Sequence, residues 1–274
     1  MTPKDLLLAL LVIVVWGLNF VVIKVGLHGM PPMLMGALRF MLAAFPAILF
    51  VRRPQVPLRW MLAYGMTISL GQFAFLFYAM YVGMPAGLAS LVLQSQAFFT
   101  LFFAALFLGE RLRGSNLFGL LVAASGLVLI GLQGGQAMTL AGFALTIAAA
   151  SMWALGKLPF LALSLWLEGP ELIAESLRTL SLDSLLVLAY LAFGATILGY
   201  GLWSRLLSRY PASQVAPFSL LVPVVGISSS ALLLGERLGS LQMVGAALVM
   251  AGLLINVWGG RLLDSWRQRT PGAV

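Results

Sequence analysis

The chain has 274 residues, of which 61% are hydrophobic and 9% are charged, and its mean hydropathy is +1.04. Soluble domains contain roughly 45–50% apolar residues, so this composition excludes a soluble domain and indicates an integral membrane protein. The net charge of +8 indicates basic loops rather than a nucleic-acid partner, because the charged residues are dispersed between apolar segments.

Apolar segments of about 20 residues, enough for a helix to cross a hydrocarbon core roughly 30 Å thick, recur along most of the chain. The first follows the charged start MTPKD, is too long for a signal peptide and lacks a small-residue cleavage site. The seventh is too short to cross alone. The predicted spans are 5–25, 33–51, 58–80, 86–108, 114–132, 139–156, 158–168, 182–207, 212–234 and 240–259.

An internal repeat divides the chain into two halves. Residues 85–112 align without a gap with residues 211–238, and both stretches begin with Pro-Ala and end with Gly-Glu-Arg-Leu. The sequence therefore predicts a duplicated five-helix unit, with copies at 1–136 and 137–274. Because five is odd, the second copy enters the membrane from the opposite face. The predicted fold is all-α, with ten transmembrane helices in two inverted repeats around a central cavity.

The distribution of basic residues supports this topology. With a cytoplasmic N-terminus and ten spans, most lysines and arginines fall in cytoplasmic loops, as the positive-inside rule requires, whereas the outer loops are mainly acidic. The basic residues placed inside are Lys4, Arg52, Arg53, Arg59, Arg111, Arg113, Lys157, Arg205, Arg209, Arg261, Arg267 and Arg269.

The segment between the sixth and eighth spans is compressed relative to the first half. If residues 139–168 formed one helix of about 42 Å, every later basic loop would move to the outside. We therefore expect about twenty residues to be absent near 156–158, within LGKLPF.

Polar side chains inside the spans are candidates for substrate binding, because hydrocarbon offers them no partner. Asn19 lies in the first span, where a hydrogen bond to a neighbouring helix is the alternative. Ser90 and Gln94 are four residues apart in the fourth span and share a helix face, and Gln214 and Ser219 occupy the matching span of the second copy.

Aromatic residues fall into two groups by depth. Those deep within their spans are candidate pocket residues, and those at span ends are expected at the membrane interface. The first group is Tyr78, Trp153 and Tyr190, and the second is Tyr81, Trp203 and Trp258.

Arg39, Pro217 and Pro223 are candidates for gating or bending. Arg39 lies one or two turns inside the outer boundary, where it either bonds helix-end carbonyls or faces water, and contact with an anionic substrate group is the alternative. The two prolines free backbone groups within the ninth span.

Small residues and paired turns complete the pattern. Small residues at 119–126 and 245–252 indicate packing or dimer faces. The two Leu-Gly-Glu-Arg-Leu segments are expected to form structural turns, with glycine at a helix end and glutamate near the start of the next helix.

The sequence contains no recognisable catalytic machinery. There is one histidine, His28, and no cysteine, metalloprotease motif, nucleophile elbow or phosphate-binding loop. The acidic residues fall in loops or at the ends of the predicted spans, so a carboxylate proton relay is not expected. The sequence thus favours uniport or exchange of a solute and predicts no enzyme activity, metal or cofactor.

Four short stretches resemble a known family. They are Trp-Gly-Leu-Asn-Phe at 16–20, Leu-Arg-Phe at 38–40 and Leu-Gly-Glu-Arg-Leu at 108–112 and 234–238. In this order, and with the duplication, the chain resembles the EamA-type members of the drug/metabolite transporter superfamily. The resemblance implies ten helices in two inverted halves and alternating access to a central cavity. It is strongest to members that export aromatic amino acids.

The resemblance places the cavity on spans 1, 3, 4, 6, 8 and 9. It implies export of aromatic or other neutral amino acids across the bacterial inner membrane, with both termini cytoplasmic and no nucleic-acid partner; a homodimer is a further expectation. The substrate-binding residues expected on this basis are Asn19, Gln72, Tyr78, Ser90, Gln94, Trp153, Tyr190, Gln214 and Ser219.

Other functions stay open at this point. A nucleotide-sugar or other drug/metabolite permease would need several cationic residues in its cavity. A non-transporting membrane scaffold would need no polar cavity, and a channel would place its pore on an axis shared between subunits.

Overall fold

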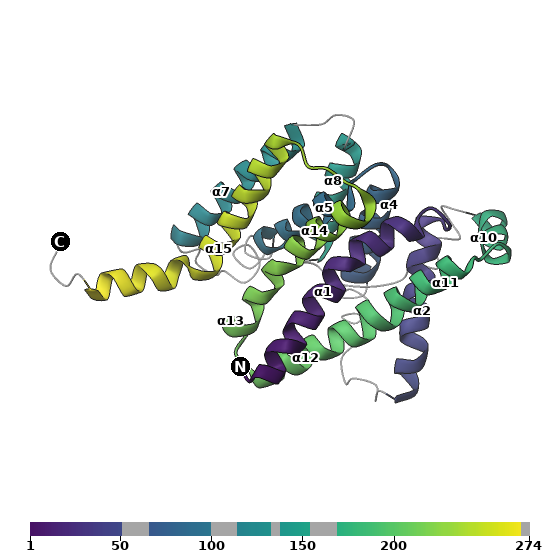
Figure 1. Ribbon diagram of the computed structural model, residues 1–274, viewed down its shortest axis with the longest axis horizontal. Coiled ribbons are helices and arrows are strands. Elements are labelled where there is room, and N and C mark those ends of the chain that lie inside the picture. The colour runs from purple at the N-terminus through teal and green to yellow at the C-terminus, as the bar shows by residue number, and fades with distance from the viewer. Residues whose placement is uncertain (51–65, 100–113, 133–137, 154–168, 270–274) are drawn as a thin grey trace.

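The computed structural model describes residues 1–50, 66–99, 114–132, 138–153 and 169–269, and every element within these ranges is a helix (Figure 1). The first half contains α1 (Pro3–Gly26), α2 (Pro32–Phe50), η1 (Met66–Gly71), α4 (Gln72–Tyr81), α5 (Ala86–Val92), η2 (Leu93–Ser95) and α7 (Gly114–Leu132). The second contains α8 (Leu140–Trp153), α10 (Gly169–Arg178), α11 (Leu182–Ala189), η3 (Tyr190–Leu198), α12 (Gly199–Arg209), α13 (Ala212–Val215), η4 (Ala216–Leu221), α14 (Val222–Leu234) and α15 (Ser240–Arg269).

The length and composition of the helices agree with a membrane protein. The described helices at Pro3–Gly26, Leu182–Arg209 and Pro217–Leu234 are long and apolar enough to cross a membrane, and five shorter apolar helices accompany them. The protein is therefore an all-helical membrane protein. The predicted seventh span, at 158–168, lies outside the described residues.

Capping residues set several helix ends. Thr2 Oγ1 accepts a hydrogen bond from the Asp5 N–H at the start of α1 (3.2 Å). Gly235, with φ of +67°, ends α14 in the left-handed conformation that glycine favours. The predicted glycine at the helix end is thus confirmed at this repeat, and its counterpart at 108–112 lies outside the described residues.

Helices α7 and α15 form a close pair on one side of the molecule (Figure 1). A Cβ atom on Gly126 would lie 2.5 Å from the carbonyl oxygen of Gly245, and one on Gly252 would lie 2.5 Å from that of Gly119. Only residues without a side chain allow backbones to approach this closely. The two predicted packing faces therefore meet each other within one chain, and the pair is antiparallel.

In the rest of the bundle, helices from the two halves pack against each other. Helix α1 contacts α12 and α14, helix α4 contacts α8, and helix α5 contacts both α8 and α14. Large apolar side chains of α4 and α5, such as Phe77 and Leu88, are fully buried in this core. The centre of the bundle is therefore built from both halves.

The upper end of the bundle in Figure 1 holds the end of α1 and the starts of α8 and α11. Lys24 Nζ donates to the carbonyl of Met80 (3.0 Å), and Thr139 Oγ1 donates to that of Val82 (2.8 Å). Ser184, in the first turn of α11, lies against the loop between α1 and α2. Helices α8 and α11 therefore run in the same direction, away from this end.

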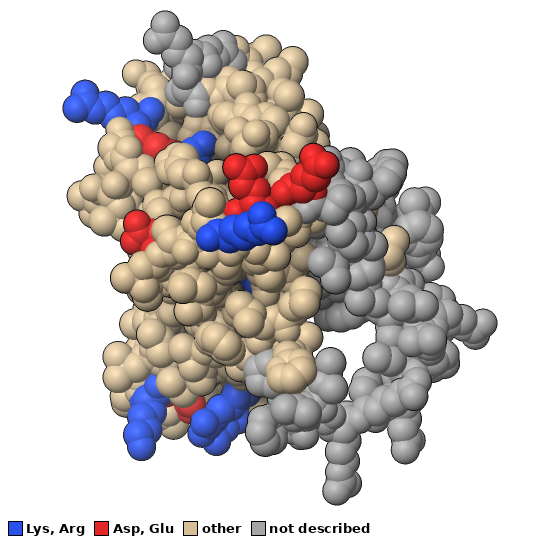
Figure 2. All heavy atoms as spheres, turned by 90° about the vertical axis from the view of Figure 1, so that its right-hand side faces the viewer, with Lys and Arg blue, Asp and Glu red and all other residues tan. Residues whose placement is uncertain are grey.

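The lower end joins the start of α1 to the connection between α12 and α13. The Tyr210 hydroxyl donates to Asp5 Oδ2 (2.7 Å) and accepts from the backbone N–H of Thr2 (3.1 Å). Arg209 Nη1 lies 3.5 Å from Asp5 Oδ1. On the face in Figure 2, a broad and almost entirely uncharged band separates the charged side chains of the upper part from a mainly basic group at this end, as a bilayer would require.

Candidate functional site

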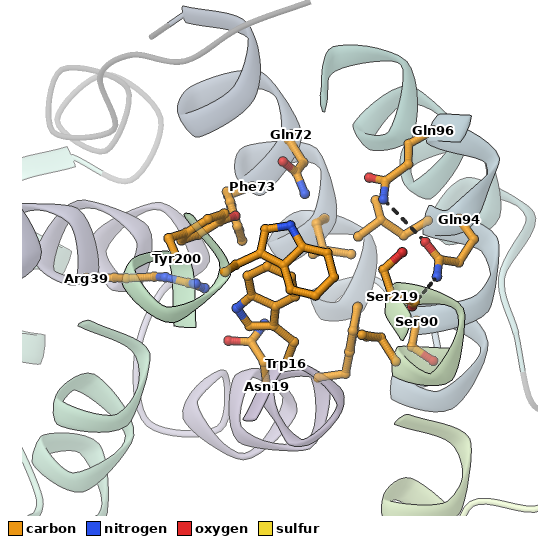
Figure 3. Close-up of a pocket in the computed structure, with 15 residues that line it drawn as sticks. Trp16, Asn19, Arg39, Gln72, Phe73, Ser90, Gln94, Gln96, Tyr200 and Ser219 are labelled. Carbon is orange, nitrogen blue, oxygen red and sulfur yellow. Dashed lines mark hydrogen bonds between the residues drawn. The ribbon is translucent and has the colours of Figure 1, made fainter. Parts of the chain in front are cut away.

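A cavity of about 300 Å³ lies in the middle of the bundle (Figure 3). Its walls come from α1, α2, α4, α5 and η2 of the first half and from α12, η4 and α14 of the second half. The lining residues are Trp16, Asn19, Phe20, Arg39, Gln72, Phe73, Leu76, Ser90, Leu93, Gln94, Gln96, Tyr200, Trp203, Ser219 and Val222.

Aromatic rings form the middle of the cavity wall. The Trp16 ring lies 5.2 Å from that of Tyr200 and 5.3 Å from that of Trp203, measured between ring centroids. Trp16 Nε1 donates to the carbonyl of Ala195 (3.1 Å), which lies in the π-helical segment η3. π-helical turns, which are wider than α-helical turns, frequently occur at functional sites. Here the turn supplies the carbonyl that holds the Trp16 indole at the cavity wall.

Arg39 contributes the only charged side chain among the described residues that line the cavity. It is 2% exposed, and its Nε donates to Thr196 Oγ1 (3.1 Å), again in η3. Its guanidinium carbon lies 4.5 Å from the centre of the Phe73 ring and 5.5 Å from that of Phe40. These contacts hold the guanidinium at the cavity wall.

Amide side chains occupy the opposite side of the cavity (Figure 3). Gln96 Nε2 donates to Gln94 Oε1 (3.3 Å), and Gln94 Nε2 donates to the backbone carbonyl of Ser219 (3.1 Å). Two further amides, Asn19 and Gln72, each have a buried side-chain oxygen without a hydrogen-bond partner in the described part of the chain. Buried polar atoms are normally paired, so these oxygens suit a ligand.

The structure brings together six residues that the sequence singled out. Asn19, Gln72, Ser90, Gln94 and Ser219 line the cavity, and so does Arg39, which was expected in gating. The Ser90 hydroxyl donates to the carbonyl of Gly87 within its own helix (2.7 Å), so its oxygen is left to accept a bond.

Three other predicted binding residues, Tyr78, Tyr190 and Gln214, do not line the central cavity. Tyr78 lines a second, more apolar cavity of about 940 Å³ near the upper end, with Tyr81 and residues of α10. Tyr190 donates its hydroxyl proton to the carbonyl of Val15, and Gln214 is exposed on α13. The side chain of Trp153 lies outside the described part of the structure.

Sequence reasoning missed most of the aromatic wall. Trp203 was expected at the membrane interface, and this is corrected, because the ring lies against Trp16 in the cavity. Tyr200, three residues earlier on α12, also lines the cavity. Positions three apart share a helix face, and that spacing is the signal that could have placed both rings together.

The predicted bending prolines lie where the ninth helix is irregular. Pro217 falls in the 3-10 segment η4, and Pro223 falls in the first turn of α14. The helix therefore changes from 3-10 to α-helical geometry close to the cavity residue Ser219. A role of the two prolines in gating stays a prediction.

Glu236 links the two halves at the upper end of the bundle, a contact that we call the upper closure. Its carboxylate accepts the backbone N–H groups of Ala86 (2.9 Å) and Gly87 (3.0 Å), the first two residues of α5. We expected this glutamate to lie at the start of the helix that follows it. It instead caps α5, a helix of the other half. There the carboxylate accepts hydrogen bonds from backbone N–H groups that have no partner within the helix.

A polar, ring-lined cavity in the centre of an apolar helical bundle is the arrangement of a membrane transport protein. The comparison with protein families agrees, because the EamA-like transporter family matches residues 4–132 and again 136–258. The chain belongs to this family, whose members form part of the drug/metabolite transporter superfamily.

Similar proteins carry transporter names. A "probable amino-acid metabolite efflux pump" of Salmonella typhimurium is 55% identical, with 96% of this chain and 97% of the relative covered. A protein of the same name from Escherichia coli K12 is 54% identical, with 98% of each covered. A "probable terminal-alkyne amino-acid exporter" of Streptantibioticus cattleyicolor is 28% identical, with 96% of each covered.

The fold of this chain is also similar to that of a solved structure. A protein with a known crystal structure matches with a TM-score of 0.57 at 19% identity, covering 96% of this chain and 100% of that chain. The alignments with the two efflux pumps run over 291 and 297 residues, more than the 274 of this chain. Each pump therefore contains residues without a counterpart here, and their position near 156–158 stays a prediction.

Proposed function

We propose that the protein exports small amino-acid metabolites across the bacterial inner membrane by alternating access to the central cavity. The observation that carries this proposal is the cavity itself, which is built from both halves and includes buried polar atoms of Asn19, Arg39 and Gln72 that lack partners in the described part of the chain. The names of the two efflux pumps, at 55% and 54% identity, support the same class of substrate.

Aromatic and other neutral amino acids suit the lining of the cavity. The rings of Trp16, Tyr200 and Trp203 offer stacking surface for an apolar side chain. The free oxygens of Asn19 and Gln72 can accept hydrogen bonds from an ammonium group. Polar and apolar recognition are therefore available side by side.

Transport without a carboxylate proton relay is also part of the proposal. No acidic residue occurs among those described as lining the cavity. A solute moving by uniport or exchange needs no proton acceptor there, so collapse of a pH gradient should change the rate little.

The proposed architecture is ten spans in two inverted repeats, with both termini in the cytoplasm. Two family matches in one chain support the duplication. The helix contacts also follow the repeat. Helix α1 packs against α12 and α14, and its counterpart α8 packs against α4 and α5, which are the counterparts of α12 and α14. The starts of α8 and α11, which both lie at the upper end, support a separate seventh span between them. A homodimer stays a proposal.

The rival functions have less support. A nucleotide-sugar permease would need several cations, whereas Arg39 is the one cation among the described lining residues. A scaffold would not need partnerless polar atoms in a central cavity.

Counterflow in proteoliposomes tests the proposed function. Vesicles loaded with unlabelled amino acids should accumulate the same labelled compound transiently, and vesicles loaded with sugars or phosphorylated compounds should not. Protein-free vesicles provide the control. Accumulation of labelled sugar phosphates, or of no amino acid in the panel, would contradict the proposal.

A further inference from the structure

Arg39 is a buried cation that has no acidic partner among the described residues. Its side chain is 2% exposed, and the ion pair found among the described residues joins two others, Arg209 and Asp5, at the lower end. Glu236 lies at the upper end, where it caps α5. A buried charge is strongly unfavourable unless it is paired, so this guanidinium calls for an anion.

The guanidinium is also fixed in orientation. Nε is bound to Thr196 Oγ1, and the ring of Phe73 lies against the guanidinium at 4.5 Å. Nη1 is buried and has no hydrogen-bond partner in the described part of the chain. Figure 3 shows the side chain reaching toward the cavity beside Tyr200. A planar donor group held in this way matches a carboxylate.

We propose that Arg39 is the subsite that binds the carboxylate of the transported molecule. This inference rests on the proposed function and names its substrate class, which is molecules with a free carboxylate next to an apolar or aromatic body. The carboxylate lies at Arg39 and Tyr200, the body packs against Trp16, and the amides of Gln94 and Gln96 face it from the opposite side.

A substrate-binding role of Arg39 can be distinguished from a role in the fold or in gating alone. A structural arginine would affect acids and their amides equally. A carboxylate subsite instead discriminates between a compound and its own carboxamide, because the amide leaves the buried charge unpaired.

The test is competition in the counterflow assay with two matched pairs of probes. L-phenylalanine is compared with L-phenylalaninamide, and L-threonine with L-threoninamide. The variants are Arg39→Gln and Arg39→Lys, and Arg178→Gln is the matched control, because Arg178 is an exposed arginine on α10. Should Arg39→Gln not fold, Thr196→Val replaces it and frees the guanidinium from its orienting bond.

In the wild type, each acid should compete at least about 10-fold better than its amide. Arg39→Gln should weaken the acid about 10- to 100-fold and bring the ratio of acid to amide close to one. Arg39→Lys should keep the preference for the acid with weaker binding, Thr196→Val should reduce that preference several-fold, and Arg178→Gln should behave as the wild type.

Equal competition by acid and amide in the wild type would overturn the carboxylate subsite and leave the proposed function standing. An unchanged ratio in Arg39→Gln, or in Thr196→Val where it replaces that variant, would do the same. By contrast, wild-type protein that counterflows no amino acid at all would contradict the proposed function.

Discussion

At the scale of single residues, one amide connects the two halves of the cavity. Gln94 comes from the first half, and its Nε2 donates to the backbone carbonyl of Ser219 in the second half (3.1 Å). Its Oε1 accepts from Gln96 (3.3 Å). Gln94 therefore fixes the cavity wall and holds a polar surface in place, and the loss of either bond would leave buried groups unpaired.

Replacing Gln94 with alanine should weaken transport without unfolding the protein. One lost hydrogen bond costs about 1 kcal/mol, so the half-saturating substrate concentration in counterflow should rise roughly five- to ten-fold. Gln214→Ala is the matched control, because Gln214 is exposed on α13. Unchanged kinetics of Gln94→Ala would remove this side chain from the site.

The polar part of the cavity could be predicted from the sequence, but most of the aromatic part could not. Amides inside an apolar span have few acceptable environments, so hydropathy together with the family resemblance could assign Asn19, Gln72 and Gln94 to the cavity. Aromatic rings are stable at the interface, in the core or in a pocket. The depth of Trp203 along its helix therefore indicated the wrong location, whereas the binding role of Tyr78, which lines a different cavity, stays a prediction.

At the scale of elements, close backbone approach holds α7 and α15 together. The contact depends on glycines whose carbonyl oxygens occupy the space where a side chain would begin. Within such a contact the backbones must separate to admit even one methyl group.

Gly252→Ala should therefore lower the free energy of unfolding by about 1–3 kcal/mol. Gly201→Ala provides a matched control within α12, because no atom lies within 4 Å of its added Cβ, and it should be neutral or slightly stabilising. Thermal unfolding in detergent measures both. Equal stability of the two variants would contradict the close packing of α7 against α15.

Glu236 makes a second prediction at this scale. Glu236→Gln removes the negative charge at the start of α5, where the carboxylate accepts two N–H groups, and should weaken the upper closure by about 1 kcal/mol. The chain has no cysteine, so Leu88→Cys, buried beneath this closure, provides a single label.

A thiol reagent should label Leu88→Cys several-fold faster in the Glu236→Gln background. Glu175→Gln, on the exposed face of α10, is the control and should leave the rate unchanged. Equal labelling rates in both backgrounds would show that the cap does not hold this end closed. The sequence indicated a glutamate at a helix start but could not identify the helix, since the capped residues are 149 and 150 positions away.

At the scale of the whole molecule, the two ends of the bundle should lie on opposite sides of the membrane. The lower end contains Asp5 and Arg209, and the upper end contains Lys24 and the starts of α8 and α11. The internal repeat and the charge distribution predicted this arrangement. Neither the repeat nor the charges could describe the seventh span. Comparison of the two halves shows only that the chain between the sixth and eighth spans is shorter than the matching part of the first half.

Single cysteines can map this topology. Ser208→Cys, at the lower end of α12, should react only with reagent on the cytoplasmic side, and His28→Cys, in the loop after α1, should react only from the outside. Labelling of both positions from one side would contradict the proposed orientation.

The most direct test of alternating access is the accessibility of a cysteine in the central cavity. Ser219→Cys places a thiol at the cavity wall in a chain that otherwise has none. We expect impermeant reagent to label it from either side of the membrane, and we expect a transported amino acid to slow the reaction from both sides. Labelling from neither side, or labelling that substrate leaves unchanged, would contradict a central transport cavity.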